Sequence, residues 1–253
     1  MTEVERCPTG IEGLDELLEG GFPRGRVILV AGGCGTGKST LGVQFLCNGA
    51  LRCGESGVLV TLEQHPKRIK QEMRVMGFDL DALEAAGKLV IVDASLSDII
   101  FKERGSEFAL SPTASFGMES LLGLIEDAAR KVDAKRAVVD SFSALDTLLE
   151  TRRSHTSGSI QEDSRKMALG INYKLQSIGL TSILTKDLFD DPRAGRYGME
   201  EFIADGVITL HYTVSGPDRG RHLIIKKMRS TKHSENINTL EFVKGQGIRV
   251  KGF

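Results

Sequence analysis

Residues 26–48 read RVILVAGGCGTGKSTLGVQFLCN, a glycine-rich stretch between two apolar ones. It contains the pattern G-x-x-x-x-G-K-[ST], from Gly32 through Lys38 to Ser39, which is typical of phosphate loops. A β-branched apolar run precedes the glycines and an apolar-rich stretch follows them, so the sequence predicts a strand, a turn and a helix. Backbone N–H groups of such a turn surround an anionic oxygen, and the helix N-terminus adds positive potential. The stretch therefore predicts binding of ATP or GTP.

The residues of this loop have separate expected tasks. Lys38 should reach the β- and γ-phosphates and assist catalysis, and the Ser39 hydroxyl should ligate Mg²⁺. Asp140 closes the buried run RAVVD, where its carboxylate can hold the same ion through the water shell. The residues expected to bind the nucleotide are Gly33, Gly35, Thr36, Gly37, Lys38, Ser39 and Thr40.

Hydrolysis also needs a group that orients or deprotonates the attacking water. Glu63 ends the apolar run GVLVTLE, and we take it as the candidate catalytic base. The competing carboxylate, Asp93, ends a later run and has no second feature that supports it. A solvated glutamate at the end of a strand remains the alternative interpretation of Glu63.

Several nearly continuous apolar runs recur along the chain, which is typical of strands buried on both faces. Amphipathic stretches lie between them, so we expect an α/β fold with a mostly parallel sheet covered by helices. The expected strands lie at 26–33, 57–63, 88–95, 136–142 and 180–187, and the clearest helices at 117–132 and 161–178. Two polar segments, 97–116 and 187–202, are candidate mobile loops.

After about residue 205 the runs become short and are joined by a few turn residues, as in SGPDRG and KGQG. Such short connections are too short for a parallel crossover, so we expect antiparallel hairpins that extend the sheet. The last 35 residues carry nine Lys and Arg against two Glu, although the net charge of the whole chain is −1. This basic end requires an explanation.

Composition is that of a globular protein, with 40% hydrophobic and 26% charged residues among 253. The apolar runs fall short of the roughly 18 residues of a membrane span, and the N-terminus lacks the apolar core of a signal peptide. The four cysteines show neither zinc spacing nor a disulfide framework. We expect one cytoplasmic domain that covers residues 1–253.

Five stretches of the chain together resemble a KaiC-type domain of the RecA-like ATPases, from about Cys7 to Val250. They read CPTGIEGLDELLEGGFPRGRVILVAGGCGTGKSTLGVQFL, GVLVTLEQHPKRIKQEMRVMGFDL, VVDSFSAL, RYGMEEFIADGVITL and IIKKMRSTKH. The resemblance implies a RecA-like core, ATP with Mg²⁺, and a ring, usually a hexamer, with nucleotide between subunits. It also implies that Glu63 is the base. The family commonly has two acids there, whereas this chain has Glu63 followed by Gln64.

The family's K-x-R-x-[ST]-x-H stretch is matched in the basic end of the chain. The resemblance implies that these residues bind the nucleotide of the adjacent subunit, with Lys227 and Arg229 as catalytic cations. The spacing agrees, because residues two apart on a strand share one face. A solvated basic sheet edge is the alternative. The matching positions are Lys227, Met228, Arg229, Thr231 and His233.

Three functions remain open. The leading one is a slow ATPase ring whose nucleotide state alters its shape or its affinity for a protein partner. A DNA-handling ATPase like RecA or RadA is the second, although the segment 187–202 is rich in acids and should repel phosphate. The third is an ATP sensor that hardly hydrolyses. Cys34 lies inside the loop, where positive potential is expected to favour the thiolate, and the hypothesis is that its oxidation or alkylation blocks ATP binding. The alternative is a variable loop position that is filled by a small residue.

Overall fold

The computed structural model describes residues 4–94, 118–144, 160–188, 201, 203–216 and 219–252. The expected loop 97–116 lies outside these residues, as does most of the segment 187–202. The first half of the chain holds β1 (Arg6–Cys7), β2 (Phe22–Pro23), β3 (Val27–Gly32), α1 (Lys38–Asn48), β4 (Gly57–Thr61), α2 (Pro66–Val75), α3 (Leu80–Ala85) and β5 (Leu89–Asp93). The second half holds α5 (Met118–Lys131), β6 (Arg136–Asp140), α7 (Ile160–Ser177), β7 (Thr181–Asp187), β8 (Gly206–Thr213), β9 (Gly220–Met228), β10 (Asn238–Val243) and β11 (Gly247–Lys251).

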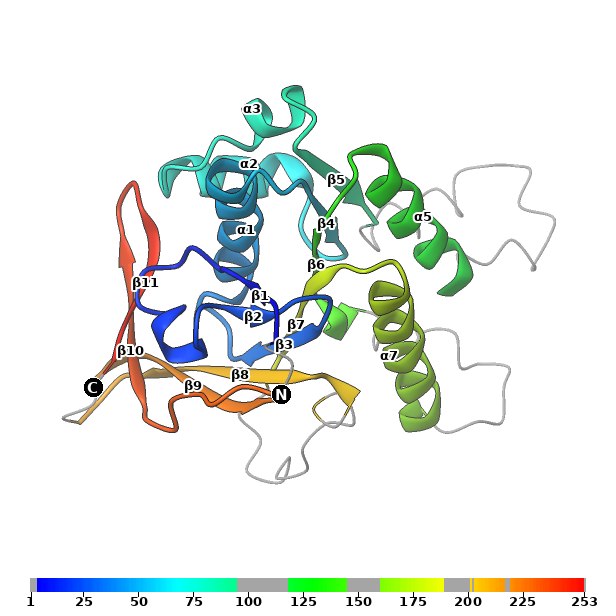
Figure 1. Cartoon of the computed structure of the whole chain (residues 1–253). Helices are drawn as coiled ribbons and strands as arrows, with labels where there is room; N and C mark the ends of the chain where they lie inside the picture. The colour runs from blue at the N-terminus through cyan, green and yellow to red at the C-terminus, as the bar shows by residue number, and fades with distance from the viewer. Residues whose placement is uncertain are drawn as a thin grey trace.

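A mostly parallel sheet forms the centre of the molecule, as the sequence predicts (Figure 1). Its strand order is β11-β10-β9-β8-β3-β7-β6-β4-β5. The strands from β8 to β5 run parallel, whereas β9, β10 and β11 are antiparallel to their neighbours. The expected C-terminal hairpins are therefore confirmed, with one correction. The strand β8 joins β3 in parallel, because the long connection after β7 allows a return to the same end of the sheet.

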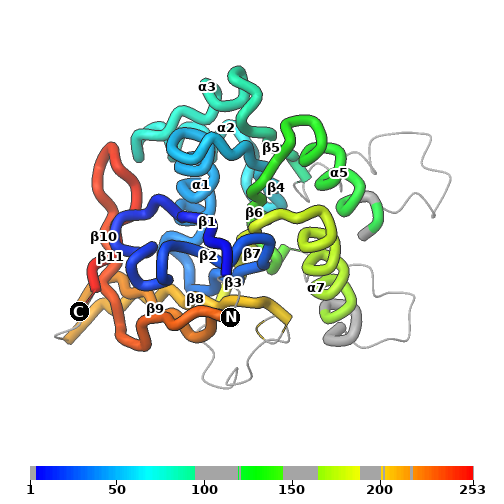
Figure 2. The backbone as a smooth tube through the Cα atoms, in the orientation of Figure 1, coloured from blue at the N-terminus to red at the C-terminus, as the bar shows by residue number. Residues whose placement is uncertain are grey.

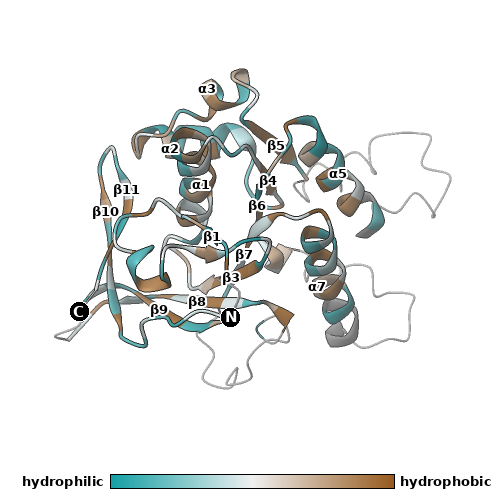
Figure 3. Ribbon diagram, in the orientation of Figure 1, coloured by the Kyte–Doolittle hydropathy of each residue, from teal (hydrophilic) through white to brown (hydrophobic). Residues whose placement is uncertain are grey.

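Both faces of the central strands β3, β4 and β6 are buried, which explains their continuous apolar runs. Side chains of β3 alternate, so that Ile28 and Val30 pack beneath α1 while Leu29 and Ala31 face the opposite core. That opposite core is covered by α5 and α7, which lie side by side in Figures 1 and 2. Figure 3 shows polar and apolar residues interspersed along these two helices, in keeping with their amphipathic sequences.

Parallel strands bring their carboxyl ends to one edge of the sheet. Gly32 at the end of β3 pairs in register with Asp187 of β7, and Thr61 of β4 pairs with Asp140 of β6. The phosphate loop, Asp140 and Glu63 all follow or end these strands, so they share this carboxyl edge. Among the described residues, no helix is long and apolar enough to cross a membrane.

Candidate functional site

The phosphate loop leaves β3 at Gly32 and enters α1 at Lys38, as the motif requires. Gly35 and Gly37 have φ angles of +72° and +108°, a conformation that side chains disfavour. A Cβ atom at Gly37 would also lie 2.9 Å from the ring of Phe242, which packs beneath the loop. The Thr36 hydroxyl donates to the Gly33 carbonyl over 2.8 Å and is buried. The loop is thus held in one shape, with the helix N-terminus opening into it.

Lys38 is almost fully buried, with 8% of the residue exposed. Its ammonium donates to the Gly33 carbonyl over 2.9 Å and pairs with Asp187 over 2.8 Å. No sequence motif identified Asp187 as a site residue. The sequence did contain a sign of this role, because Asp187 is the last residue of the expected strand 180–187. The carboxyl ends of parallel strands meet at one edge of a sheet, which places Asp187 near the loop.

The two expected Mg²⁺ contacts lie together at the carboxyl edge. The Ser39 hydroxyl donates to the carboxylate of Asp140, and so does the hydroxyl of Thr185, which the sequence analysis missed. Burial raises the pKa of Asp140, against the opposing effect of these two hydrogen bonds and the Lys38 charge. A hydroxyl beside a carboxylate is an oxygen donor set that fits Mg²⁺.

Glu63 lies two residues beyond β4 and is exposed. Its carboxylate accepts a hydrogen bond from the hydroxyl of Ser141, the residue that follows Asp140. The other carboxylate, Asp93, ends the edge strand β5 and lies 3.9 Å from His65. Since β4 and not β5 pairs with β6, Glu63 is the strand-end acid closer to the expected metal position.

The segment 227–233 lies at the opposite, amino edge of the sheet. Lys227 donates to the carbonyl oxygens of Ala204 over 2.6 Å and of Glu201 over 3.1 Å. The Arg229 guanidinium lies 3.6 Å from the carboxylate of Asp205, whose backbone bonds to Val27 at the start of β3. Burial lowers the pKa of Lys227, and the positive charge of Arg229 lowers it further. The two cations therefore lie near each other, although Arg229 is one residue beyond β9.

Other members of the matched stretch contact the N-terminal segment. Thr231 accepts a hydrogen bond from Arg6 over 2.5 Å, and Arg6 pairs with Glu19 over 3.0 Å. Glu19 also accepts the backbone N–H of Lys232 over 3.1 Å. The buried Met228 packs in the core, and the ring of His233 contacts the Ser234 carbonyl. No sequence pattern pointed to Arg6 or Glu19, because their partners lie more than 200 residues away.

One further cation from β9 lies at the phosphate loop itself. Arg221 donates to the Gly35 carbonyl over 2.9 Å, and its guanidinium lies 4.8 Å from the ring centres of both Tyr212 and Phe242. The basic end of the chain therefore divides between the two edges of the sheet. Arg221 lies near the start of β9 beside the loop, and Lys227 lies near its end at the amino edge.

Comparison with known proteins identifies the family and the fold of the chain. A family model described as "ATPase: KaiC" matches residues 7–252. A UPF0273 protein of Aeropyrum pernix is 36% identical over 98% of this chain and 94% of its own length. The KaiC-like protein of Pyrococcus horikoshii has a crystal structure with a TM-score of 0.79, at 35% identity over 99% of this chain and 100% of that one. The circadian clock oscillator protein KaiC of Thermostichus vulcanus is 35% identical over 91% of this chain, which spans 41% of that longer relative.

Proposed function

The chain belongs to the KaiC family of ATPases, and we propose that it hydrolyses Mg²⁺-ATP at sites shared between copies of itself. The proposed assembly is a closed ring, a hexamer, in which each nucleotide lies between two neighbours. The nucleotide state would then set the shape of the ring and its affinity for a protein partner.

The separation of the two groups of residues within one chain is the observation that carries this proposal. The loop follows Gly32 at the carboxyl edge, while Lys227 and Arg229 lie at the amino edge near Val27. Five residue steps of β3 separate the edges, about 16 Å at the usual rise of a parallel strand. At this separation Arg229 would not reach the nucleotide bound by its own chain, which supports the proposal that a second copy supplies this cation.

Each proposed residue has a definite role. Ser39 and Asp140 would hold Mg²⁺, which would neutralise phosphate charge when bound. Lys38 would donate to the β- and γ-phosphates, and Glu63 would accept the proton of the attacking water. The water oxygen bonds to the γ-phosphorus as the bond to the bridging oxygen breaks, giving ADP and inorganic phosphate. Arg229 of the neighbouring copy would stabilise the negative charge that develops.

Mixed assemblies test the shared site directly. Lys38→Ala disables the loop but keeps the donated cation, whereas Arg229→Ala disables the cation but keeps the loop. Each variant alone should be inactive. When equal amounts are mixed before ATP is added, about a quarter of the interfaces combine an intact loop with an intact cation, so about a quarter of parental phosphate release should return.

A monomer that hydrolyses ATP and ignores Arg229→Ala would contradict the proposal. Light scattering with and without Mg²⁺-ATP measures the assembly, and Glu63→Gln separates hydrolysis from sensing. In a true ATPase this variant should bind ATP but lose turnover, by about 10²-fold or more. Turnover that is equally low in both proteins would favour the non-hydrolysing sensor.

The structure gives little support to the DNA-handling alternative. Several described cations of the basic end are paired with carboxylates, as when Arg249 and Lys251 both contact Glu241. Arg229 likewise faces Asp205. Binding of DNA needs cations that are available to the phosphates of its backbone. A salt-dependent affinity for single-stranded DNA, if measured, would support this alternative.

A further inference from the structure

Asp205 occupies the amino edge of the sheet, immediately before β8, and is 2% exposed. Its backbone N–H donates to the Val27 carbonyl, and its own carbonyl accepts from the N–H of Arg229, each over 2.9 Å. One residue therefore joins the first residue of β3 to the backbone of Arg229. The position of that arginine is fixed relative to the central strand of the sheet.

The two carboxylate oxygens of Asp205 have different partners. One oxygen, Oδ2, accepts from the side-chain amide of Gln176 over 2.7 Å and from the backbone N–H of Val27 over 3.4 Å. The other, Oδ1, faces the guanidinium groups of Arg26 at 3.5 Å and Arg229 at 3.6 Å. The first oxygen holds the carboxylate in place, and the second presents its charge to the arginines.

Arg229 needs such a partner, because its side chain is 56% exposed and long. An arginine side chain that is ordered from solution loses conformational entropy. A carboxylate that is already fixed by Gln176 and Val27 restricts the arginine before the neighbouring copy arrives. A cation that is oriented in advance stabilises a transition state better than one that must be ordered during the reaction.

We propose that Asp205 is a positioning residue that holds Arg229 toward the nucleotide site of the neighbouring copy. This inference rests on the proposed shared site and goes beyond it, because it assigns a role to a buried carboxylate that touches no nucleotide. Arg26 faces the same oxygen at nearly the same distance and has no part in the proposed reaction, so it provides a matched control.

Asp205→Asn is the decisive substitution. The asparagine carbonyl can still accept from Gln176 and Val27, whereas its NH₂ group meets the two guanidinium groups and cannot attract them. We expect the melting temperature and the affinity of the loop for Mg²⁺-ATP to stay near parental values. Turnover should fall about tenfold to a hundredfold, the cost of misplacing a catalytic group by about 1 Å. Arg26→Ala should leave turnover near that of the parent.

The mixed assembly isolates the donated surface. Arg229→Ala chains provide the loops, and either Lys38→Ala or Lys38→Ala/Asp205→Asn chains provide the cation. Recovered phosphate release should be at least tenfold lower with the double variant. Equal recovery with both donors would overturn the inference and leave the shared site intact. If Lys38→Ala itself restores nothing, the shared site is wrong and the inference falls with it.

A second substitution tests the inference if the Asp205→Asn variant does not fold. Gln176→Leu, one residue before the end of α7, removes the hydrogen bond to Oδ2 and keeps the carboxylate. Recovered activity should fall in the same assay, by less than with Asp205→Asn. Full recovery with a Lys38→Ala/Gln176→Leu donor would count against a held carboxylate.

Discussion

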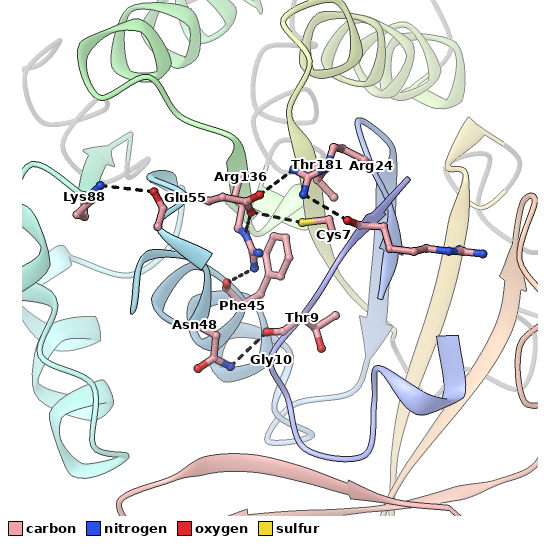
Figure 4. A network of polar contacts seen from close by, with 12 residues as sticks. Cys7, Thr9, Gly10, Arg24, Phe45, Asn48, Glu55, Lys88, Arg136 and Thr181 are labelled. Atoms are coloured by element: carbon pink, nitrogen blue, oxygen red, sulfur yellow. Dashed lines mark hydrogen bonds and ion pairs between the residues drawn. The ribbon is translucent and has the colours of Figure 1, made fainter. Parts of the chain in front are cut away.

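Removal of Glu55 should destabilise the fold strongly, because its partner Arg136 is fully buried. Arg136 begins β6, and its Nε donates to Glu55 over 2.7 Å while Nη1 donates to the Phe45 carbonyl over 3.0 Å. The guanidinium also lies 4.5 Å from the centre of the Phe45 ring. The second oxygen of Glu55 pairs with Arg24 over 2.8 Å, and Figure 4 shows this network together with Cys7.

The expected magnitude follows from the burial of the cation. Glu55→Ala leaves the Arg136 charge without a counterion in the protein interior, and such a loss costs about 3–5 kcal/mol. This is a large fraction of the roughly 5–15 kcal/mol that stabilises a typical domain. Replacement of the whole pair should cost much less, so Glu55→Leu/Arg136→Met should recover most of the loss.

Urea unfolding followed by circular dichroism measures these free energies. Lys135→Ala is the control, since Lys135 precedes Arg136 but forms an exposed ion pair with Asp133, and its loss should change stability little. A Glu55→Ala cost below about 1 kcal/mol would refute the argument that the buried cation requires its carboxylate. A double variant that is less stable than either single variant would refute it too.

The same pair predicts how stability depends on pH. Burial raises the pKa of Glu55, but the hydrogen bonds and charges of Arg136 and Arg24 outweigh this and hold it below its ordinary value. A lowered carboxyl pKa contributes stability that is present above the ordinary value and is lost as the pH falls through the lowered one. Parental stability should therefore decline in that acidic window, and Glu55→Gln should show a smaller decline there.

Three further predictions concern the nucleotide site and the donated segment. Asp187→Asn removes the negative charge that competes with phosphate for Lys38. ATP should therefore bind about tenfold more tightly, as measured by fluorescence titration, and weaker binding would contradict this. Alkylation of the exposed Cys34 should block ATP binding in the parent but spare Cys34→Ala, whereas equal loss in both would show that another thiol is responsible. Arg6→Ala and Glu19→Ala should each lower turnover severalfold with ATP affinity unchanged, because each removes a contact that holds the segment after Arg229. A change in ATP affinity alone would argue against a role for these contacts in placing Arg229.

The sequence was sufficient for features that depend on local order. Gly32, Lys38 and Ser39 form a motif whose spacing requires a strand, a loop and a helix, and the structure has these elements at those residues. The apolar runs identified the parallel strands because a strand that is buried on both faces has no polar alternation. Asp140 and Glu63 could be selected because each follows such a run.

Features that depend on strand order could not be predicted from local sequence. Asp187 and Thr185 join the site only because β7 lies between β3 and β6, and no motif encodes that order. Arg221 reaches the loop because β9 runs antiparallel to β8 and brings its first residues to the carboxyl edge. Asp205 belonged to a stretch that was recognised, yet its two sets of partners come from α7, β3 and the end of β9. Such contacts become visible only when the register is known.

The central strand β3 explains why nucleotide binding and assembly should be linked in this protein. At its last residue, Gly32, it begins the phosphate loop, and at its first residue, Val27, it is bonded to the carboxylate and backbone of Asp205 beside Arg229. In the proposed ring, each chain would carry one half of two different sites, one at each edge of the sheet. An ATP molecule that contacts both chains binds more tightly when the second chain is present. By linkage, ATP must then strengthen the association of the two chains by the same free energy. Arg229→Ala, which removes the donated cation altogether, should then weaken ATP-dependent assembly and turnover together, although Arg229 lies far from the loop of its own chain.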